Sequence, residues 1–309
     1  MNNIIPILFI IFNRPSIAAR SFEEIKKVKP SRLYLASDGP RDNKPGEREV
    51  VENTRQTILN MIDWECEVKT LFRDKNVGCS QGVYTAVNWL FENEEMGIIL
   101  EDDCVISETF YQFMSELLER YKDDKRIGMI AGTNPVLHIP SHPYSYFFSR
   151  YKSCWGWATW CRAWLNMDID MEWRSVDKDS ILYNSGYGGK DTDYWNFELK
   201  YIDEGLVSAW DWQWYFSLAA QNQLCIYPKN NLVTNIGNEV GATHLRFTDD
   251  VYKSYNIVFP LSHPKYIVPY LPYEKAYYKS FNTIGRKIAR RLPFKIKELI
   301  KQIVVKCKL

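Results

Sequence analysis

Strand-like and helical segments alternate through the first 135 residues, and this alternation constrains the fold more than any other feature of the chain. Apolar runs occur at residues 4–12, 32–40, 66–74, 97–101 and 126–134, and segments of helical character separate them at 16–28, 47–62, 79–91 and 108–121. Strands that alternate with helices are typical of a parallel sheet. The pattern therefore predicts an α/β fold with a mostly parallel, doubly wound central sheet.

The regular alternation of strand-like and helical segments ends near residue 135, where the sequence becomes rich in aromatic residues. Aromatic residues crowd the segments "SYFFSRYKSCWGWATWCRAW" and "VSAWDWQWYFSLA", and no flexible linker separates them from the first half. We expect one elaborated domain with halves at 1–135 and 136–270, followed by a tail at 271–309.

Composition excludes several classes of protein. The formal net charge of +1 gives no basis for binding polyanions, so we expect no nucleic-acid partner. Seven scattered cysteines without a CxxC pair argue against a disulfide framework and a structural zinc site, and favour a reducing cytosol. The apolar run at 4–12 is about half of the ~20 residues that a membrane helix needs, so it is better interpreted as a buried strand. An aromatic content of 15% leans toward a sugar ligand.

Polar residues lie at or directly after the C-terminal end of each of these five strand-like segments. They are Asn13-Arg14, Ser37-Asp38, Arg73-Asp74, Glu101-Asp102-Asp103 and Thr133-Asn134. Ligands of doubly wound sheets collect at the carboxyl ends of the strands. Strands must end somewhere, and polar residues also turn chains, but five such ends together favour a site.

The acid run Glu101-Asp102-Asp103 follows the apolar residues 98–100 directly, and an apolar pair at 105–106 comes next. Strand alternation would place Glu101 and Asp103 on one face and Asp102 on the other. Buried acids need cations or a metal, and oxygen ligands suit Mg²⁺ or Mn²⁺. A solvated acidic turn, or salt bridges to Lys and Arg, is the competing interpretation.

Three further segments carry candidate residues whose roles stay open at this level. Asp38 in "SDGP" is positioned for a nucleobase or ribose, although Asp-Gly is also a common turn. Asp211 in "SAWDWQW" lies between two tryptophans, which suits a general base with a raised pKa, or a buried helix cap. His244 in "GNEVGATHL" is a ligand or a structural histidine. The loop "RDKNVGCSQGV" matches neither a P-loop nor a dinucleotide fingerprint, which sets both of those enzyme classes aside.

Taken in order, these motifs resemble the nucleotide-sugar glycosyltransferases of the GT-A fold, a Rossmann-like fold. They are most similar to the inverting N-acetylglucosaminyltransferase I family and its bacterial relatives. The resemblance covers residues 5–245 and is carried by "FNRP", "SDGP", "ILEDDCVIS", "FYQFMSELLERY", "MIAGTN", "CWGWATWCRAW", "AWDWQW" and "IGNEVGATHL". The sequence departs from the eukaryotic members in having "WDW" where they carry two adjacent acids, and in showing no membrane anchor or stem.

The resemblance implies a role for each matching residue. Asp103 would bind the divalent metal, Mn²⁺ or Mg²⁺, with His244 as an additional metal or diphosphate contact, and Asp211 would deprotonate the acceptor hydroxyl. The donor-binding residues would be Arg14, Asp38, Arg73, Asn76, Glu101 and Asp102. The sugar and acceptor pockets would be shaped by Asn134, Trp155, Gly156, Trp157 and Trp212. The first half would thus bind the nucleotide sugar, and the second half would bind the acceptor and carry the catalytic base.

The expected function is a metal-dependent inverting glycosyltransferase that moves a sugar from a nucleoside-diphosphate donor, with uracil as the expected base, to a hydroxyl of a glycan or a polyprenyl-linked glycan. Such a reaction would belong to bacterial surface polysaccharide synthesis. The alternatives are a sugar nucleotidyltransferase and a non-catalytic glycan-binding protein on the same fold.

The C-terminal tail forms a separate feature. Apolar residues recur at helical spacing after Pro293, and the lysines at positions 295, 297, 301, 306 and 308 occupy much of the remainder. A basic amphipathic helix indicates an anionic membrane surface, or else a helix that docks on the core. We expect a cytoplasmic protein held peripherally at the inner face of the membrane.

Overall fold

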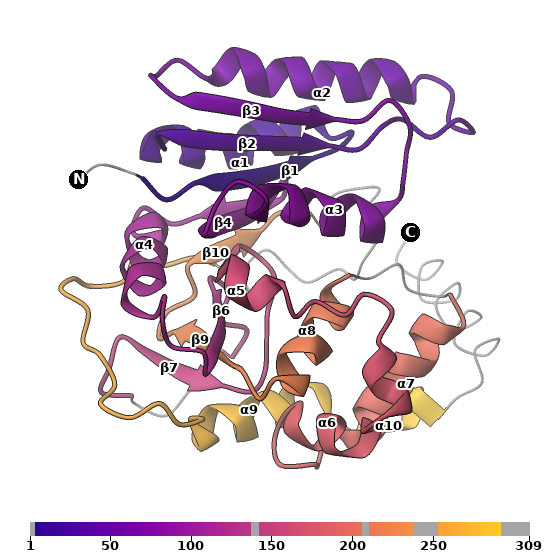
Figure 1. Cartoon of the computed structure of the whole chain (residues 1–309), viewed down its shortest axis with the longest axis vertical. Helices are drawn as coiled ribbons and strands as arrows, with labels where there is room; N and C mark the ends of the chain where they lie inside the picture. Colours follow the sequence, from indigo (N-terminus) through magenta and orange to yellow (C-terminus); the bar gives the residue numbers. More distant parts are fainter. Residues whose placement is uncertain (1–3, 137–141, 206–209, 238–252, 292–309) are drawn as a thin grey trace.

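The computed structural model describes residues 4–136, 142–205, 210–237 and 253–291, and these residues form a layered α/β structure (Figure 1). The elements of the first half are β1 (Ile7–Ile11), α1 (Pro15–Val28), β2 (Arg32–Ser37), α2 (Glu47–Met61), β3 (Glu67–Phe72), α3 (Cys79–Phe91), β4 (Met96–Glu101), β5 (Cys104–Ile106), α4 (Phe110–Arg120) and β6 (Ile127–Ala131). The later elements are β7 (Tyr146–Ser149), β8 (Trp157–Trp160), α5 (Cys161–Trp164), a 3-10 turn (Glu172–Ser175), α6 (Lys178–Asn184), α7 (Thr192–Asp203), α8 (Asp211–Ala220), β9 (Leu224–Pro228), β10 (Val233–Asn235), α9 (Leu271–Phe281) and α10 (Ile284–Arg291).

The central sheet has eight strands in the order β3-β2-β1-β4-β8-β6-β9-β7. The neighbours β3-β2, β2-β1, β1-β4 and β6-β9 pair in parallel. Strand β8 runs antiparallel to both β4 and β6, and β7 runs antiparallel to β9, so six strands share one direction. The predicted fold class, a mostly parallel sheet flanked by helices, is confirmed.

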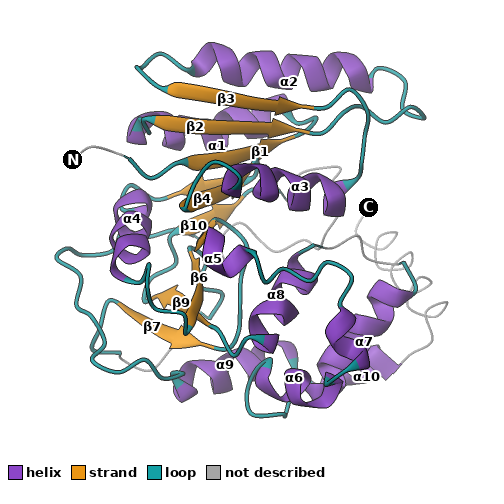
Figure 2. Ribbon diagram, viewed as in Figure 1, coloured by secondary structure: helices purple, strands orange, loops and turns teal. Residues whose placement is uncertain are grey.

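Alternation along the buried strands divides the core into two layers. In β1, Ile7 and Phe9 pack into one layer with side chains of α1 and α4, while Leu8 packs into the other with side chains of α3 and α8. Figure 2 shows the helices lying on both sides of the sheet. This is the doubly wound arrangement, in which the inner strands are buried on both faces, whereas the edge strand β3 has no buried residue.

The elements predicted in the first half are present, with small shifts at their ends. In α3, the predicted apolar face is confirmed, because Val83, Val87, Leu90 and Phe91 are all buried. Pro15 occupies the first turn of α1, where its missing N–H leaves no helical hydrogen bond unmade.

The second half contributes to the same sheet. Strand β8 is inserted between β4 and β6, so no gap in the sheet coincides with the expected boundary at 135. The sequence did not predict β8, because all four of its residues are buried and the strand therefore shows no alternation of polar and apolar residues. The domain limits themselves stay a prediction.

The last described helix, α10, ends at Arg291, and the predicted amphipathic segment after Pro293 lies outside the described residues. Arg290 is tied to the end of α9 through hydrogen bonds to the Phe281 carbonyl and the Asn282 side chain. Within the described ranges, no helix combines the length and apolar character needed to cross a bilayer.

Candidate active site

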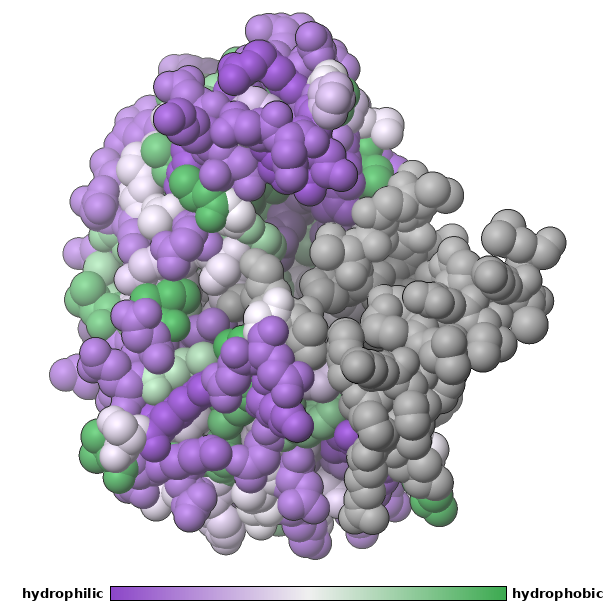
Figure 3. Space-filling view, turned by 90° about the vertical axis from the view of Figure 1, so that its right-hand side faces the viewer, coloured by the Kyte–Doolittle hydropathy of each residue, from purple (hydrophilic) through white to green (hydrophobic). Residues whose placement is uncertain are grey.

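The carboxyl ends of β1, β2, β3 and β4 lie side by side and deliver polar residues to one edge of the sheet. In Figure 1 these four arrows point the same way, toward the right of the molecule. Figure 3 looks at that side, where the described surface of the upper half is largely hydrophilic. The predicted convergence of strand ends is therefore present for the first four strands.

The acid run begins at the last residue of β4 and continues through a tight turn. Glu101 ends the strand, Asp102 and Asp103 form the turn, and Cys104 starts β5. Asp102 is buried, whereas Glu101 and Asp103 are half-buried. Because the strand ends at Glu101, the expected alternation stops there, and Asp102 and Asp103 turn toward the same partner instead of opposite faces.

That partner is Arg14, which follows β1. Its Nε donates to Asp102 Oδ2 at 3.2 Å, and its Nη2 donates to Asp102 Oδ1 and, at 3.1 Å, to Asp103 Oδ2. Burial raises the pKa of Asp102 to about 6, against the opposing attraction of Arg14. The salt-bridge interpretation of the acid run thus holds for Asp102 and Asp103, and the sequence did not identify Arg14 as their counter-ion.

Asp103 is also held from its other side by the two-stranded ribbon of β5 and β10. The Asn235 amide donates to Asp103 Oδ1 at 3.1 Å, and the Ile236 N–H donates to the Asp103 carbonyl at 2.9 Å. A Cβ at Gly237 would collide with Asp103 Oδ2, so a larger residue here would displace that carboxylate. The geometry fixes this carboxylate, at 18% side-chain exposure, in one orientation.

Glu101 interacts with a carboxylate from far along the chain. Burial, together with the negative charges of Asp103, Asp102 and Asp211, raises the pKa of Glu101 to about 8. Asp211 lies near this strand end, because its neighbour Trp210 stacks on Trp157 of β8, which pairs with Ile99 of β4. Asp211 is the first residue of α8, so the fold brings the predicted base to the acid turn.

The surroundings of Asp211 differ from the expected apolar enclosure. Asp211 is exposed, whereas Trp210 is buried and stacks on Trp157 with ring centroids 5.5 Å apart. Trp212 is half-buried and packs on Trp195. Successive residues of a helix point in directions about 100° apart, so the two flanking rings turn away from the carboxylate. A carboxylate in the first turn of a helix also interacts favourably with the helix dipole. The alternative prediction, that Asp211 stabilises the start of the helix, therefore stays open.

Asp38 organises the loop that precedes α3. Its carboxylate accepts hydrogen bonds from the N–H groups of Gly39, Val77 and Gly78 at 2.9–3.1 Å. The loop passes so close to β2 that a Cβ at Gly39 would collide with the Lys75 backbone. The structure therefore shows Asp38 as a loop anchor, and its contact with a nucleobase stays a prediction.

Arg73 and Asn76 lie in the same loop and make internal hydrogen bonds. Arg73 donates to Thr85 Oγ1 at 2.7 Å, and Asn76 donates to the Gly39 carbonyl at 2.8 Å. Burial lowers the pKa of Arg73, although Asp38 opposes this effect. Both residues are close to the strand ends, as the donor-site prediction requires.

Two supporting groups were not identified from the sequence. Buried Arg55 donates to Ser37 Oγ at 3.0 Å and to the carbonyls of Asp38 and Arg73 at 3.1 and 2.7 Å, which ties the ends of β2 and β3 together. Glu47 pairs with Arg41 and accepts from Asn13 at 2.9 Å, and these contacts lower its pKa to about 2. Both lie on α2, where an arginine and a glutamate give no signal distinct from ordinary surface residues.

The predicted pocket residues of the second half are placed mainly in packing roles. Trp157 is fully buried among aromatic rings, and Trp155 is half-buried against the other core layer. Asn134 is buried, donates to the Pro228 carbonyl at 2.9 Å and accepts from the Val136 N–H at 3.1 Å. Gly156 has a φ of +58°, and a Cβ there would lie 2.8 Å from Val233, so glycine is required. Their contact with a sugar stays a prediction.

The carboxylate oxygens of the acid turn suit a hard divalent cation that takes only one or two ligands from the protein. Asp103 offers a fixed, partly exposed carboxylate, but within the described ranges no three His, Cys, Asp or Glu side chains surround a common point. Mg²⁺ commonly binds one or two carboxylates and completes its shell with water and substrate phosphates. The residues therefore fit a metal that arrives with a diphosphate. His244, the other predicted metal contact, lies outside the described residues.

Comparisons with known proteins give distant structural similarity only. No protein-family model matches the chain, and no curated protein matches it in sequence. Among solved structures, S. aureus TarS 1–349 matches at 10% identity over 74% of this chain and 60% of that chain, with a TM-score of 0.40. A 4-diphosphocytidyl-2C-methyl-D-erythritol synthase from Anaerococcus prevotii matches at 10% identity over 57% and 78%, with a TM-score of 0.35. A UDP-glucose pyrophosphorylase complexed with UDP-glucose matches at 11% identity over 53% and 78%, with a TM-score of 0.33.

These similarities are too remote to assign an activity. Two of the three proteins are named for nucleotidyl or pyrophosphoryl chemistry, and none of the three is named as an N-acetylglucosaminyltransferase. The resemblance to the N-acetylglucosaminyltransferase I family therefore rests on the sequence motifs.

Proposed function

We propose that this protein is an inverting glycosyltransferase that transfers a sugar from a nucleoside-diphosphate donor, UDP being the first choice, to a hydroxyl of a glycan or lipid-linked glycan. The observation that carries the proposal is the position of Asp211 at the start of α8, beside Trp210, whose ring stacks on Trp157 of the strand paired with β4 near the acid turn. A carboxylate on a helix separate from the turn that would bind the diphosphate is the arrangement that deprotonation of an acceptor requires.

The chain's own residues would divide the work between two sides of the sugar. The acid turn and Arg14 would hold the diphosphate end of the donor. Asp211 would accept the proton of the acceptor hydroxyl while that oxygen attacks the anomeric carbon from the opposite side, which inverts it. When bound, Mn²⁺ or Mg²⁺ held by Asp103 would offset the charge on the departing nucleoside diphosphate.

A sugar nucleotidyltransferase is the second candidate, because it would use a similar sheet and acidic site. Such enzymes usually carry a basic, glycine-rich loop after the first strand. Here the loop between β1 and α1 is Phe12-Asn13-Arg14, without glycine. A non-catalytic glycan-binding protein is the third candidate and should ignore UDP and Mn²⁺ in calorimetry.

A panel of nucleotide sugars tests the proposal, with and without Mn²⁺, scored by release of nucleoside diphosphate. A glycosyltransferase releases the diphosphate and transfers the sugar, whereas a nucleotidyltransferase consumes the nucleotide sugar together with pyrophosphate. Consumption of the nucleotide sugar that requires pyrophosphate would replace the proposal with a sugar nucleotidyltransferase.

Asp211→Asn is the sharpest single substitution for the proposed base. We expect a loss of turnover of about 10²–10⁴-fold with unchanged donor affinity, because the carboxylate contacts the acceptor proton and not the donor. Calorimetry with UDP and Mn²⁺ measures the donor side independently. Asp203→Asn, at the end of α7, is a matched control that should keep full turnover. Turnover within a few-fold of the wild type in Asp211→Asn would remove the assignment of the base.

We also propose that the tail contacts an anionic membrane, which suits a polyprenyl-linked acceptor. The basic residues Arg286 and Lys287 of α10 are exposed just before the amphipathic sequence begins. Replacing Lys297 and Lys301 by Glu in the full chain should abolish flotation with phosphatidylglycerol vesicles, because the attraction of each lysine is worth about 1 kcal/mol. Binding to neutral vesicles should be equally weak in both proteins. Flotation that is unaffected by the charge reversal would favour docking of the tail on the core.

A further inference from the structure

Arg14 makes two unequal contacts with the acid turn. It holds Asp102 with two nitrogens, Nε and Nη2, but reaches Asp103 through Nη2 alone, at 3.1 Å. Bidentate arginine–carboxylate pairs are the stronger and more directional kind. The contact with Asp102 is therefore the anchor, and the contact with Asp103 is the weaker of the two.

Burial makes the same distinction. The side chain of Asp102 is 6% exposed, so its charge needs a permanent partner inside the protein. The side chain of Asp103 is 18% exposed and keeps the Asn235 amide as a second partner. Asp103 can therefore exchange Arg14 for another cation at lower cost than Asp102 can.

Arg14 also has N–H groups that could donate hydrogen bonds to a ligand. Its side chain is 33% exposed, and in the described part of the chain no hydrogen bond uses its Nη1. A guanidinium carries five N–H donors and suits the bidentate binding of phosphate oxygens. One side of the group thus faces the acids, and the other is available to an incoming anion.

From this geometry we propose that Arg14 couples the binding of a divalent cation to the binding of the donor diphosphate. Without nucleotide, Arg14 competes with the cation for Asp103 Oδ2. When a diphosphate binds, it draws the guanidinium toward its own oxygens while Asp102 keeps the anchor, and Asp103 is released to the metal. The inference rests on the proposed function, because it takes Asp103 as the metal ligand.

Titration of the full chain with Mn²⁺, followed by the electron paramagnetic resonance signal of the free ion, tests the coupling with and without UDP. In the wild type we expect weak Mn²⁺ binding alone and much tighter binding with UDP. In Arg14→Gln, Mn²⁺ alone should bind about tenfold more tightly, and the gain from UDP should shrink by a similar factor, within the roughly 5- to 150-fold range of site–site coupling.

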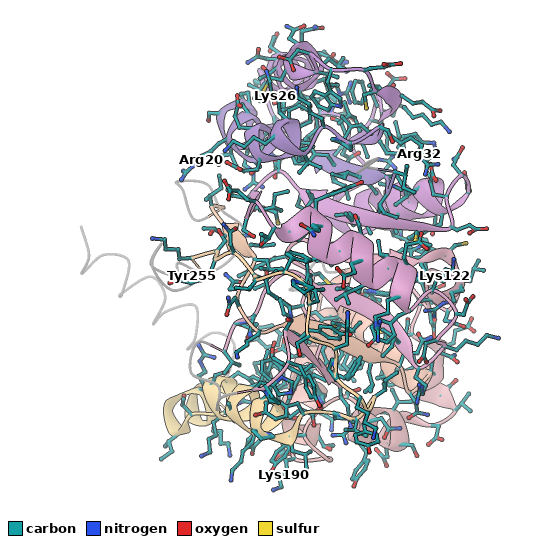
Figure 4. All side chains as sticks on the ribbon, turned by 90° about the vertical axis from the view of Figure 1, so that its left-hand side faces the viewer. Arg20, Lys26, Arg32, Lys122, Lys190 and Tyr255 are labelled. Carbon is teal, nitrogen blue, oxygen red and sulfur yellow. The ribbon has the colours of Figure 1, made fainter. Side chains whose placement is uncertain are left out.

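Two variants separate this effect from general electrostatics and from misfolding. Arg20 lies exposed on α1, the helix that begins directly after Arg14 (Figure 4), so Arg20→Gln removes an equal charge and should leave both affinities unchanged. Arg14→Lys keeps the charge but cannot span both carboxylates, so it should give an intermediate coupling. If Arg14→Gln does not fold, as judged by circular dichroism, the comparison between Arg14→Lys and the wild type decides.

Two results would overturn the inference, and they differ in what else they affect. If the wild type and the Arg14 variants bind Mn²⁺ with UDP but show the same gain from UDP, the coupling role is wrong and the proposed function stands. If the wild type does not bind Mn²⁺ even with UDP, the metal-dependent function itself fails, and the coupling role fails with it.

Discussion

Asp102 and Asp103 are adjacent and chemically identical, yet the fold gives them different roles. Asp102 is buried and locked to Arg14, whereas Asp103 is partly exposed and fixed by Asn235 of the ribbon. A buried charge that loses its partner destabilises the folded state, whereas a partly exposed one is rehydrated. The two carboxylates should therefore respond to the same substitution in different assays.

We predict that Asp102→Asn acts on stability and Asp103→Asn on turnover. Asp102→Asn should lower the free energy of unfolding by about 1–3 kcal/mol, because Arg14 loses its charged anchor. Asp103→Asn should leave stability nearly unchanged but reduce metal-dependent turnover by about 10²-fold or more. Urea unfolding and nucleoside diphosphate release measure the two effects. The opposite pattern would show that Asp102 is the working carboxylate.

At the scale of elements, the loop between β3 and α3 depends on a close approach to the end of β2. Asp38 accepts three backbone N–H groups there, and Gly39 lies against the Lys75 backbone. This packing places the start of α3, and with it Cys79, beside the acid turn. Reduced hydration, together with the negative charges of Glu101, Asp211 and Asp38, raises the pKa of the Cys79 thiol to about 12.

Gly39→Ala should displace this loop. The added methyl group has no room beside the Lys75 backbone, so we expect a loss of about 1–3 kcal/mol in the free energy of unfolding and weaker UDP binding. Gly285→Ala in α10 is the matched control, because nothing lies within 4 Å of its added Cβ. The control should be unchanged or more stable by about 0.5–1 kcal/mol. Equal stability of the two variants would contradict the close approach.

The first-half elements could be predicted from sequence because β1, β2, β4 and β6 are largely apolar and buried on both faces, and the helices repeat apolar residues at helical spacing. The same reasoning failed in the second half for a physical reason. Aromatic residues fill both layers there, so β8 and its neighbours show neither a period of two nor one of 3.6. Direction and insertion order within a sheet are also set by pairing between distant segments, which local pattern does not encode.

At the scale of the whole molecule, the second half buries a lysine in its aromatic core. Lys152 is buried, its Nζ lies 4.5 Å from the centroid of the Tyr215 ring, and within the described residues that Nζ has no hydrogen-bond partner. Burial lowers the pKa of Lys152 to about 7, although Cys225 and Glu274 oppose the shift and Arg150 adds to it.

This lysine should make the stability of the whole protein depend on pH. Between about pH 7 and the ordinary lysine pKa of 10.5, the unfolded chain holds a proton on Lys152 that the folded chain has lost. Its contribution to stability therefore rises with pH across that window and is constant below it. Lys152→Met should be more stable than the wild type at pH 7, and its advantage should shrink toward pH 10. Thermal unfolding of both proteins across this range measures the difference, and a constant difference would argue against a buried neutral amine.

The sequence alone determined the α/β class, the order of the first four strands along the chain, the acid run at a strand end and the choice of Asp211 as a candidate base, because all of these follow from local pattern and motif. The tertiary structure decided which groups meet. It showed that Arg14 pairs with Asp102 and Asp103, that Asp38 anchors a loop, and that packing of α8 on β8 brings Asp211 near the end of β4. Contacts between segments far apart in the chain depend on how the layers of the fold pack. The electrostatic interactions of a site depend on the distances that this packing sets, and no local stretch of sequence specifies those distances.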